Sequence, residues 1–412
     1  MNAPSNADAC SRLPVTVLSG FLGAGKTTLL QHLLTQPHGL RIALIVNDMS
    51  EINVDAQLLR SAPELHRSQE TLIELTNGCI CCTLREDLLR EIAALARQNR
   101  FDYLIVESSG ISEPLPVAMT FDLQHEPGAS LSEVSRLDTL VTVVDALNFP
   151  RDLGSPHTLQ DRPLNADPGD ERNISTLLID QVEFADVIVL NKTDLALAED
   201  LAEIEALLRK LNPAAKIVRA ERGRIDPRTI LNTRSFDLEK ASQSAGWIKE
   251  LQGVHTPETE EYGISSFVYR ARRPFHPLRL YMLIDKGFPG VIRSKGFIWL
   301  ASRHETMGIW AHAGASLSLE PGATWWVNAP ESARQENVQV AQYLDSLCQE
   351  PWGDRRQELV LIGSRMNKDA LTAMFNECLL TDSELAAGPA IWASYEDPFP
   401  AWTVIPVASI EN

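Results

Sequence analysis

The sequence predicts a doubly wound α/β domain with a mostly parallel sheet, followed by a smaller α+β domain. Between positions 13 and 220, short apolar runs rich in β-branched residues alternate with amphipathic stretches, which is the order of a sheet with crossover helices. The runs are apolar throughout, as in parallel strands covered on both faces. After Gly263 the pattern changes to strand-like segments mixed with helical ones. The two parts of the chain therefore belong to different fold classes.

The expected strands of the first domain follow one another with helical stretches between them. Their ranges are 14–19, 41–46, 71–75, 103–107, 140–145, 187–191 and 216–220. In the second domain we expect strands at 264–271, 290–301 and 323–328, and helices at 277–283 and 368–378. We place the first domain at 12–235, a polar linker at 236–262, the second domain at 263–385 and a tail at 386–412. A chain of 412 residues is long enough for two hydrophobic cores.

Composition and charge narrow the classes of partner. The net charge of −18 would repel a phosphate backbone, which argues against nucleic acid. The longest apolar runs are strand-sized and fall short of the roughly 18 residues that a membrane span needs. The first residues carry neither the basic start nor the apolar core of a secretion signal. We therefore expect a cytoplasmic protein with reduced thiols and no nucleic-acid or membrane partner.

The segment GFLGAGKTT at 20–28 fits the phosphate-binding pattern G-x-x-x-x-G-K-[ST] and stands between an expected strand and an expected helix. In such a P-loop, backbone N–H groups and the helix N-terminus face the phosphates of a nucleotide. Lys26 is expected to neutralise the β- and γ-phosphates, and Thr27 to ligate Mg²⁺. The candidate nucleotide-binding residues of the loop are Gly20, Gly23, Ala24, Gly25, Lys26, Thr27 and Thr28.

The tetrapeptide NKTD, which contains Asn191, Lys192 and Asp194, ends a later expected strand. A carboxylate there can accept from both the N1–H and the N2 amine of guanine, whereas adenine offers no such pair of donors. By itself the tetrapeptide is often only a polar strand end. Its position after a P-loop predicts GTP rather than ATP as the nucleotide.

Two acidic segments lie where nucleotide-sensing switches are expected. In YLIVESSG an apolar strand delivers Glu107 to the edge beside the P-loop, where it could hold the Mg²⁺ shell, and the backbone N–H of Gly110 could sense the γ-phosphate. ESSG could also be only a helix-capping turn. Asp48, Glu51 and Asp55 follow the second strand; any of them could orient water or bind Mg²⁺, or be a solvated loop acid.

Three of the six cysteines stand together in NGCICC, as Cys79, Cys81 and Cys82. They precede an amphipathic stretch that reads as a helix, whose N-terminus favours thiolates. Three thiolates leave one position open on tetrahedral Zn²⁺ for a mobile carboxylate or a recipient's side chain, although Cu(I) and Co²⁺ also fit. Buried structural thiols are an alternative. A disulfide is the least favoured interpretation, and a catalytic cysteine lacks a nearby histidine base.

The P-loop, GCICC, ESSGISEP and NKTD, in that order, resemble the CobW-like GTPases of the SIMIBI class. RARRPFHP at 270–277 and RSKGFIWLA at 293–301 look like the C-terminal domain of that family. The resemblance implies a metallochaperone that couples hydrolysis of GTP to GDP and phosphate with delivery of a metal, most often zinc, to a client apo-metalloprotein. It implies metal ligands at Cys79, Cys81 and Cys82, and guanine contacts from Asn191, Lys192 and Asp194.

VNDMSEINVD and EPWGDRRQELVLIG look most like the zinc-starvation subgroup, which implies a role in zinc homeostasis under zinc limitation. The chain departs from many relatives in having Asn47-Asp48 where they have Asn-Glu, and its nine histidines form no storage tract. Alternatives are delivery of cobalt or iron to a cobalamin-pathway or nitrile hydratase client, and a zinc sensor or buffer that binds GTP without delivering metal. An ATP-dependent kinase is a more distant alternative. The sequence leaves the oligomeric state open.

Overall fold

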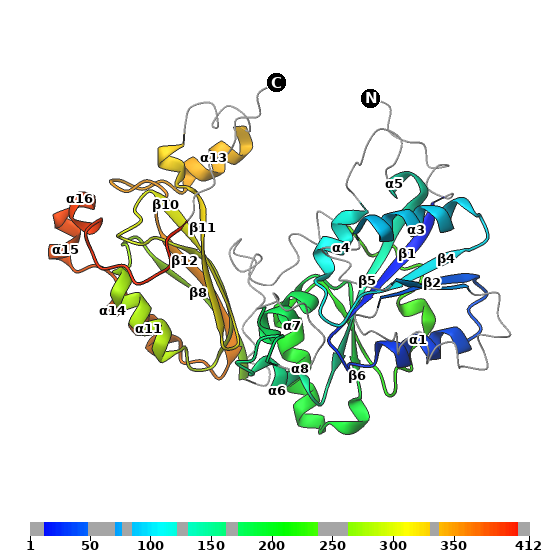
Figure 1. Ribbon diagram of the computed structural model, residues 1–412. Helices are drawn as coiled ribbons and strands as arrows, with labels where there is room; N and C mark the ends of the chain where they lie inside the picture. The colour runs from blue at the N-terminus through cyan, green and yellow to red at the C-terminus, as the bar shows by residue number, and fades with distance from the viewer. Residues whose placement is uncertain are drawn as a thin grey trace. The chain divides into compact units, whose positions relative to one another are not determined.

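The computed structural model describes residues 12–47, 71–75, 85–121, 131–161, 172–237, 263–329 and 338–402 of the chain. The chain divides into two compact units, Met1–Lys249 and Glu250–Asn412 (Figure 1). Each unit is built around one sheet. The first unit carries the P-loop.

The sheet of the first unit has seven strands in the order β3-β2-β4-β1-β5-β6-β7, and every neighbouring pair is parallel. The strands are β1 (Leu13–Ser19), β2 (Ile42–Asn47), β3 (Thr71–Leu75), β4 (Tyr103–Glu107), β5 (Ser135–Asp145), β6 (Val187–Asn191) and β7 (Lys216–Arg219). All carboxyl ends of parallel strands lie at the same edge of a sheet. The P-loop, Glu107 and Asn191 therefore share one edge.

Helices cover both faces of this sheet, which confirms the doubly wound α/β fold. They are α1 (Lys26–Thr35), α3 (Arg85–Arg97), α4 (Pro114–Thr120), α5 (Leu131–Val134), α6 (Phe149–Leu153), α7 (Ile174–Glu183) and α8 (Ala198–Leu211). Leucines of α1 pack on one face, with the segment that follows β7. Apolar residues of α3, α4 and α5 pack on the other face (Figure 1).

Strand β5 begins at Ser135, five residues before the strand predicted at 140–145. The extra residues include Asp138, which is fully buried. Its carboxylate accepts hydrogen bonds from the Tyr103 hydroxyl at 2.7 Å and from the Thr233 N–H at 2.9 Å. The sequence pattern did not predict this extension, because a charged residue usually marks the end of a buried strand. Asp138 is tolerated inside the strand only because distant residues bind its carboxylate.

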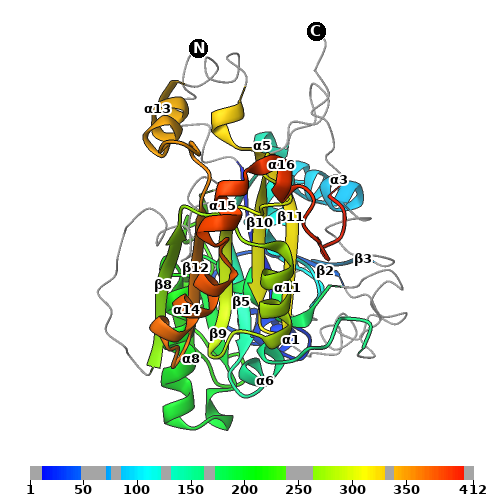
Figure 2. The same ribbon diagram turned by 90° about the vertical axis from the view of Figure 1, so that its left-hand side faces the viewer.

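The second unit has a five-stranded antiparallel sheet in the order β11-β10-β9-β12-β8. Its strands are β8 (Ile264–Ala271), β9 (Val291–Ile298), β10 (Thr306–Ala313), β11 (Ser316–Thr324) and β12 (Gln357–Ser364). Its helices are α11 (Pro277–Lys286), α13 (Val338–Ser346), α14 (Lys368–Cys378), α15 (Asp382–Ala387) and α16 (Pro389–Trp392). Apolar residues of α11 and α14 cover one face of the sheet (Figure 2). The smaller α+β domain is confirmed.

One strand predicted in this unit is wrong. The sequence predicted a strand at 323–328, but β11 ends at Thr324 and Trp326–Asn328 form a 3-10 turn. The buried carboxylate of Asp354 accepts from the N–H groups of Trp326 and Val327, at 3.0 and 2.9 Å. This distant cap ends the strand, and a local reading of ATWWVN could not include it. Strands β10 and β12 were not among those predicted.

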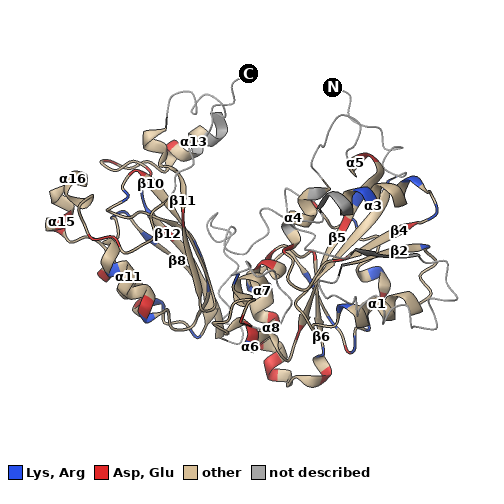
Figure 3. Cartoon of the chain, in the orientation of Figure 1, with Lys and Arg blue, Asp and Glu red and all other residues tan. Residues whose placement is uncertain are grey.

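Charged residues follow the helix dipoles where α8 is exposed. Its first turn carries Glu199 and Asp200, and its last turn carries Arg209 and Lys210 (Figure 3). The acidic residues lie at the positive N-terminal end of the helix dipole and the basic residues at its negative C-terminal end, where each charge is stabilised. Within the described part of the chain, no helix is both long enough and apolar enough to cross a membrane.

Candidate nucleotide site

The loop between β1 and α1 has the backbone of a phosphate cradle. Gly25 stands at the N-cap of α1 with φ 101° and ψ 28°, in the left-handed region. A Cβ there would lie 2.3 Å from Asn191 Nδ2, so only glycine fits. Lys26 is 7% exposed, and its Nζ donates to the carbonyl oxygens of Gly20 and Phe21 at 2.9 and 3.4 Å. The ammonium is thus held at the loop, above a helix N-terminus that favours anions.

Asn191 ties the tetrapeptide NKTD to this loop. Its side chain is 1% exposed; Nδ2 donates to the Ala24 carbonyl at 2.9 Å, and Oδ1 accepts from the Gly223 N–H at 2.9 Å. One amide therefore joins the P-loop, the end of β6 and the turn that follows β7. Asp194 lies in the next turn, η2 (Thr193–Leu195), and is exposed. Thr28 is exposed as well, on the first turn of α1.

Lys192 adopts a left-handed conformation at φ 62°, and its Nζ lies 2.7 Å from Asp145 Oδ2. Asp145 ends β5 and also accepts from the Asn148 side chain at 2.7 Å. Burial acts to raise the pKa of Asp145, but the hydrogen bonds from Lys192 and Asn148 outweigh it and the pKa lies below its usual value. The carboxylate is therefore ionised and fixes Lys192. The sequence analysis did not predict a site role for Asp145. The available signal was the acidic residue in VVD, at the carboxyl end of a strand expected beside β1.

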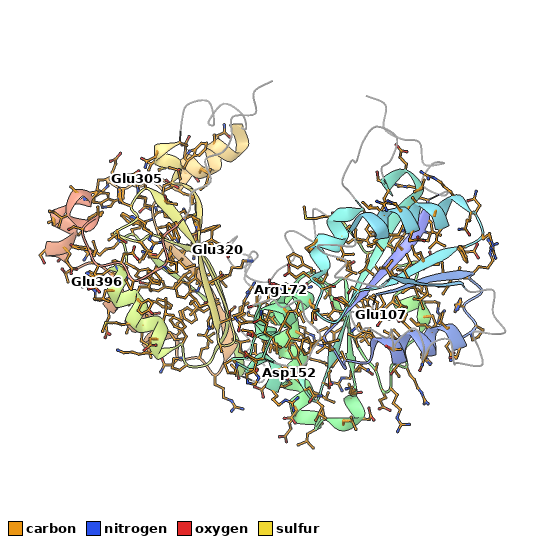
Figure 4. The ribbon with its side chains drawn as sticks, viewed as in Figure 1. Glu107, Asp152, Arg172, Glu305, Glu320 and Glu396 are labelled. Atoms are coloured by element: carbon orange, nitrogen blue, oxygen red, sulfur yellow. The ribbon has the colours of Figure 1, made fainter. Side chains whose placement is uncertain are left out.

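Glu107 and Gly110 lie beside the P-loop. Glu107 ends β4, is 1% exposed, and pairs in register with Leu18 of β1 and Val46 of β2 (Figure 4). A Cβ on Gly110 would lie 2.6 Å from the Leu22 side chain and 2.8 Å from the Leu22 backbone nitrogen. The loop after β4 therefore touches the P-loop so closely that only glycine fits at position 110.

Asp48, Cys79, Cys81 and Cys82 lie outside the described residues, as do Glu51 and Asp55. The described elements on either side of them are β2, β3 and α3. Strand β3 ends at Leu75, opposite Asn47 of β2, and helix α3 begins at Arg85. The chain thus enters the cysteine segment from the same sheet edge that bears the P-loop.

A pocket of about 220 Å³ opens beside the P-loop. The loop forms one wall through Phe21, Leu22, Gly23 and Ala24. The other walls come from the carboxyl end of β5, from α6 and α7, and from Lys192; they include Asp145, Asn148, Arg151, Asp152 and Gln181. The structure thus brings the phosphate loop, the Lys192–Asp145 pair and helix α7 around one space.

Comparison with known proteins places this site in a family. The model of the "CobW/HypB/UreG, nucleotide-binding domain" matches residues 14–219, and that of the "Cobalamin synthesis protein cobW C-terminal domain" matches residues 264–379. The chain belongs to the CobW family. It is a P-loop GTPase of that family, which confirms both the predicted resemblance and the predicted activity.

The CobW-family relatives include proteins named for zinc. "Zinc-regulated GTPase metalloprotein activator 1" of Dictyostelium discoideum is 47% identical over 399 residues, 94% of this chain and 84% of the relative. "Zinc chaperone CobW" of Pseudomonas aeruginosa is 36% identical over 225 residues, 52% of this chain and 58% of the relative. The crystal structure of Zn(II)-bound YjiA GTPase from E. coli has a TM-score of 0.38 at 21% identity, covering 90% of this chain and 99% of that one.

Proposed function

We propose that this CobW-family GTPase is a metallochaperone that binds Zn²⁺ through Cys79, Cys81 and Cys82 and transfers it to client metalloproteins when zinc is scarce. One observation carries the proposal: β3, which leads into the cysteine segment, is parallel to β1 and β4 in the same sheet. Strand β3, which precedes the cysteine segment, therefore ends at the sheet edge that holds the nucleotide loops.

The nucleotide side of the proposal assigns roles to residues at this edge. Lys26 neutralises phosphate charge. The segment of Asn191, Lys192 and Asp194 forms the base-binding end, where Asn191 shapes the loop and Asp194 reads guanine. Thr27 and Glu107 offer a hydroxyl and a carboxylate, which are the hard oxygen ligands that Mg²⁺ prefers. Bound there, Mg²⁺ would supply charge neutralisation for phosphoryl transfer. The backbone of Gly110 reads the γ-phosphate, and Asp48 belongs to the other switch.

The metal side rests on the chemistry of thiolates. Three of them hold Zn²⁺ tightly, so release to a client requires that one nucleotide state weakens the site. GTP orders the switch segments and hydrolysis releases them. The names of the similar proteins support zinc as the metal. Coupling of this kind is reciprocal, so zinc must change nucleotide affinity by the factor by which nucleotide changes zinc affinity.

Zinc titration of the full chain tests the coupling. We expect the affinity for Zn²⁺ to differ at least about fivefold between the GDP state and a state with a non-hydrolysable GTP analogue. The Cys79/Cys81/Cys82→Ala variant should lose tight zinc binding and keep GDP binding. Cys348→Ala, which removes a thiol from the other unit, is the matched control and should bind zinc as the wild type does. Equal zinc affinity in both nucleotide states would contradict the coupling.

Transfer is tested separately with an apo-metalloenzyme as acceptor. We expect zinc-loaded protein with GTP to restore acceptor activity faster than zinc-loaded protein with GDP. Tight binding without transfer in any nucleotide state would instead identify a sensor or buffer. Faster GTP hydrolysis with Co²⁺ or Fe²⁺ than with Zn²⁺, together with their transfer, would identify delivery of those metals.

A further inference from the structure

The loop that follows β4 is held by side chains from the segment of α7. The Gln181 Nε2 donates to the carbonyl oxygens of Gly110 and Ser112, at 3.3 and 3.2 Å. Arg172, which lies just before α7, donates through Nη2 to the Ile111 carbonyl at 3.0 Å. Three consecutive carbonyls of the loop are therefore bound by two side chains from one segment of the chain.

Gln181 is itself fixed. Gln181 is 1% exposed, and its main-chain carbonyl oxygen accepts from the Thr142 hydroxyl of β5 at 2.6 Å. Helix α7 ends at Glu183 and β6 begins at Val187, so the same segment leads into the guanine tetrapeptide. The amide of Gln181 thus joins the loop after β4 to helix α7, which leads into β6.

Arg172 adds a second contact at the far side of the loop. Its Nη1 lies 2.8 Å from Glu113 Oε1. Glu113 is the N-cap of α4, so this ion pair holds the point where the loop becomes a helix. The ion pair is partly exposed and contributes little by itself. The buried amide contacts of Gln181 are the stronger constraint.

We propose that Gln181, assisted by Arg172, is a positioning residue of the GTPase reaction. By binding the carbonyls on either side of Ile111, it fixes the peptide planes that follow Gly110 and keeps Gly110 pressed against Leu22. The residue acts through the backbone after Gly110, which its side-chain amide holds in place. The proposal rests on the role of Gly110 given under the proposed function.

The donor chemistry of Gln181 yields a specific test. In Gln181→Met the side chain keeps its size and loses both donors. In Gln181→Glu a carboxylate faces two carbonyl oxygens, which repel it, whereas the protonated acid can donate one hydrogen bond. Loss of the loop contacts should lower kcat about tenfold, which corresponds to ~1.4 kcal/mol, while KM for GTP stays within about twofold.

The chain contains a matched control for the burial of a new acid. Asn212 is fully buried and, through Nδ2, donates to the carbonyls of Val182, Glu183 and Ala185, at 2.9, 3.1 and 2.8 Å. It binds carbonyls at and just after the end of the same helix, and within the described residues none of its hydrogen bonds is to the loop after β4. Asn212→Asp should lower the melting temperature and leave kcat near the wild-type value below that temperature.

The decisive measurement is the ratio of variant to wild-type kcat between pH 8 and pH 6. We expect the ratio for Gln181→Glu to be low at pH 8 and to rise at pH 6, while the ratios for Gln181→Met and Asn212→Asp stay flat. The proposal is wrong if folded Gln181→Met hydrolyses GTP at the wild-type rate, or if Asn212→Asp shows the same loss and recovery. Because none of these assays contains zinc, their outcome is independent of whether the protein delivers metal.

Discussion

The side-chain amide of Asn191 joins separate parts of the nucleotide site. It binds backbone groups of Ala24 and Gly223 and stands within 2.3 Å of where a Cβ on Gly25 would lie. The nitrogen and the oxygen of the amide are both hydrogen-bonded to the protein backbone. Asp194, in contrast, is exposed at the same edge of the sheet. We infer a division of labour, in which Asn191 shapes the loop for any nucleotide and Asp194 reads the base.

Replacement of Asn191 and replacement of Asp194 should therefore change the affinities for GDP and IDP in different ways. Asn191→Ala leaves a buried carbonyl and a buried N–H without partners, at a cost of about 1–3 kcal/mol, so GDP and IDP should both bind more weakly by the same factor. Asp194→Ala should weaken GDP more than IDP, because inosine lacks the N2 amine that the carboxylate accepts from. Calorimetric titration with both nucleotides measures the ratio. A changed ratio in Asn191→Ala would contradict the division.

Asp186, which directly precedes β6, binds the middle of strand β5. Its Oδ2 accepts from the Leu140 N–H at 2.7 Å. Burial raises the pKa of Asp186 to about 6; the Leu140 hydrogen bond opposes the rise, and the charges of Asp138 and Asp237 add to it. Since the folded carboxyl holds its proton more tightly than the unfolded one, this group stabilises the fold as pH falls through 6, and that contribution is absent at higher pH.

Asp186→Asn should remove this dependence. The amide oxygen still accepts from Leu140, so the strands keep their contact. When the pH is lowered from 8 to 5.5, protonation of Asp186 should raise the free energy of unfolding of the wild type by about 1 kcal/mol. The variant should lack this increase. Urea unfolding followed by far-UV circular dichroism measures the difference.

Asp102→Asn serves as the comparison for this experiment. The hydrogen bond from Arg41 lowers the pKa of Asp102 to about 2, so its titration lies below the window. The slope between pH 8 and pH 5.5 should match that of the wild type. An equal slope in the Asp186→Asn variant and the wild type would show that Asp186 does not titrate in this range.

Elements made of apolar runs were predictable. The strands expected at 71–75, 103–107 and 187–191 coincide with β3, β4 and β6, since a parallel strand covered on both faces needs continuous apolar sequence. The beginning of β5 and the end of β11 were not predictable. In both places a buried aspartate, Asp138 or Asp354, binds N–H groups from a distant part of the chain, and no local pattern encodes such a partner.

At the scale of the whole molecule, the second unit carries an acid-sensitive group. His312 of β10 is 6% exposed and packs edge-on against Phe288, with ring centroids 5.5 Å apart. Burial lowers the pKa of His312 to about 4, and the charge of Arg293 adds to this. The neutral ring stabilises the fold fully above the unfolded pKa of about 6.5, and this contribution is lost as pH falls toward 4.

Tryptophan fluorescence can report on this unit, because seven of the eight tryptophans lie in Glu250–Asn412. Between pH 8 and pH 5.5, His312 should cost this unit about 1 kcal/mol of stability. Urea unfolding followed by fluorescence should show a smaller loss in His312→Gln than in the wild type. His38→Gln, in the other unit, should leave the fluorescence transition unchanged; a wild-type pH slope in His312→Gln would contradict the assignment.

The sequence by itself determined the fold class of both units, the P-loop and the tetrapeptide. These features depend on local residue type and order: apolar runs specify covered strands, and glycines with lysine and threonine specify a phosphate loop. Only the tertiary structure revealed that Asn191 binds Ala24 and Gly223, that Asp145 fixes Lys192, and that Gln181 holds the loop after β4. The physical reason is that each contact joins residues far apart in the chain, which meet only because parallel strands bring their carboxyl ends to one edge.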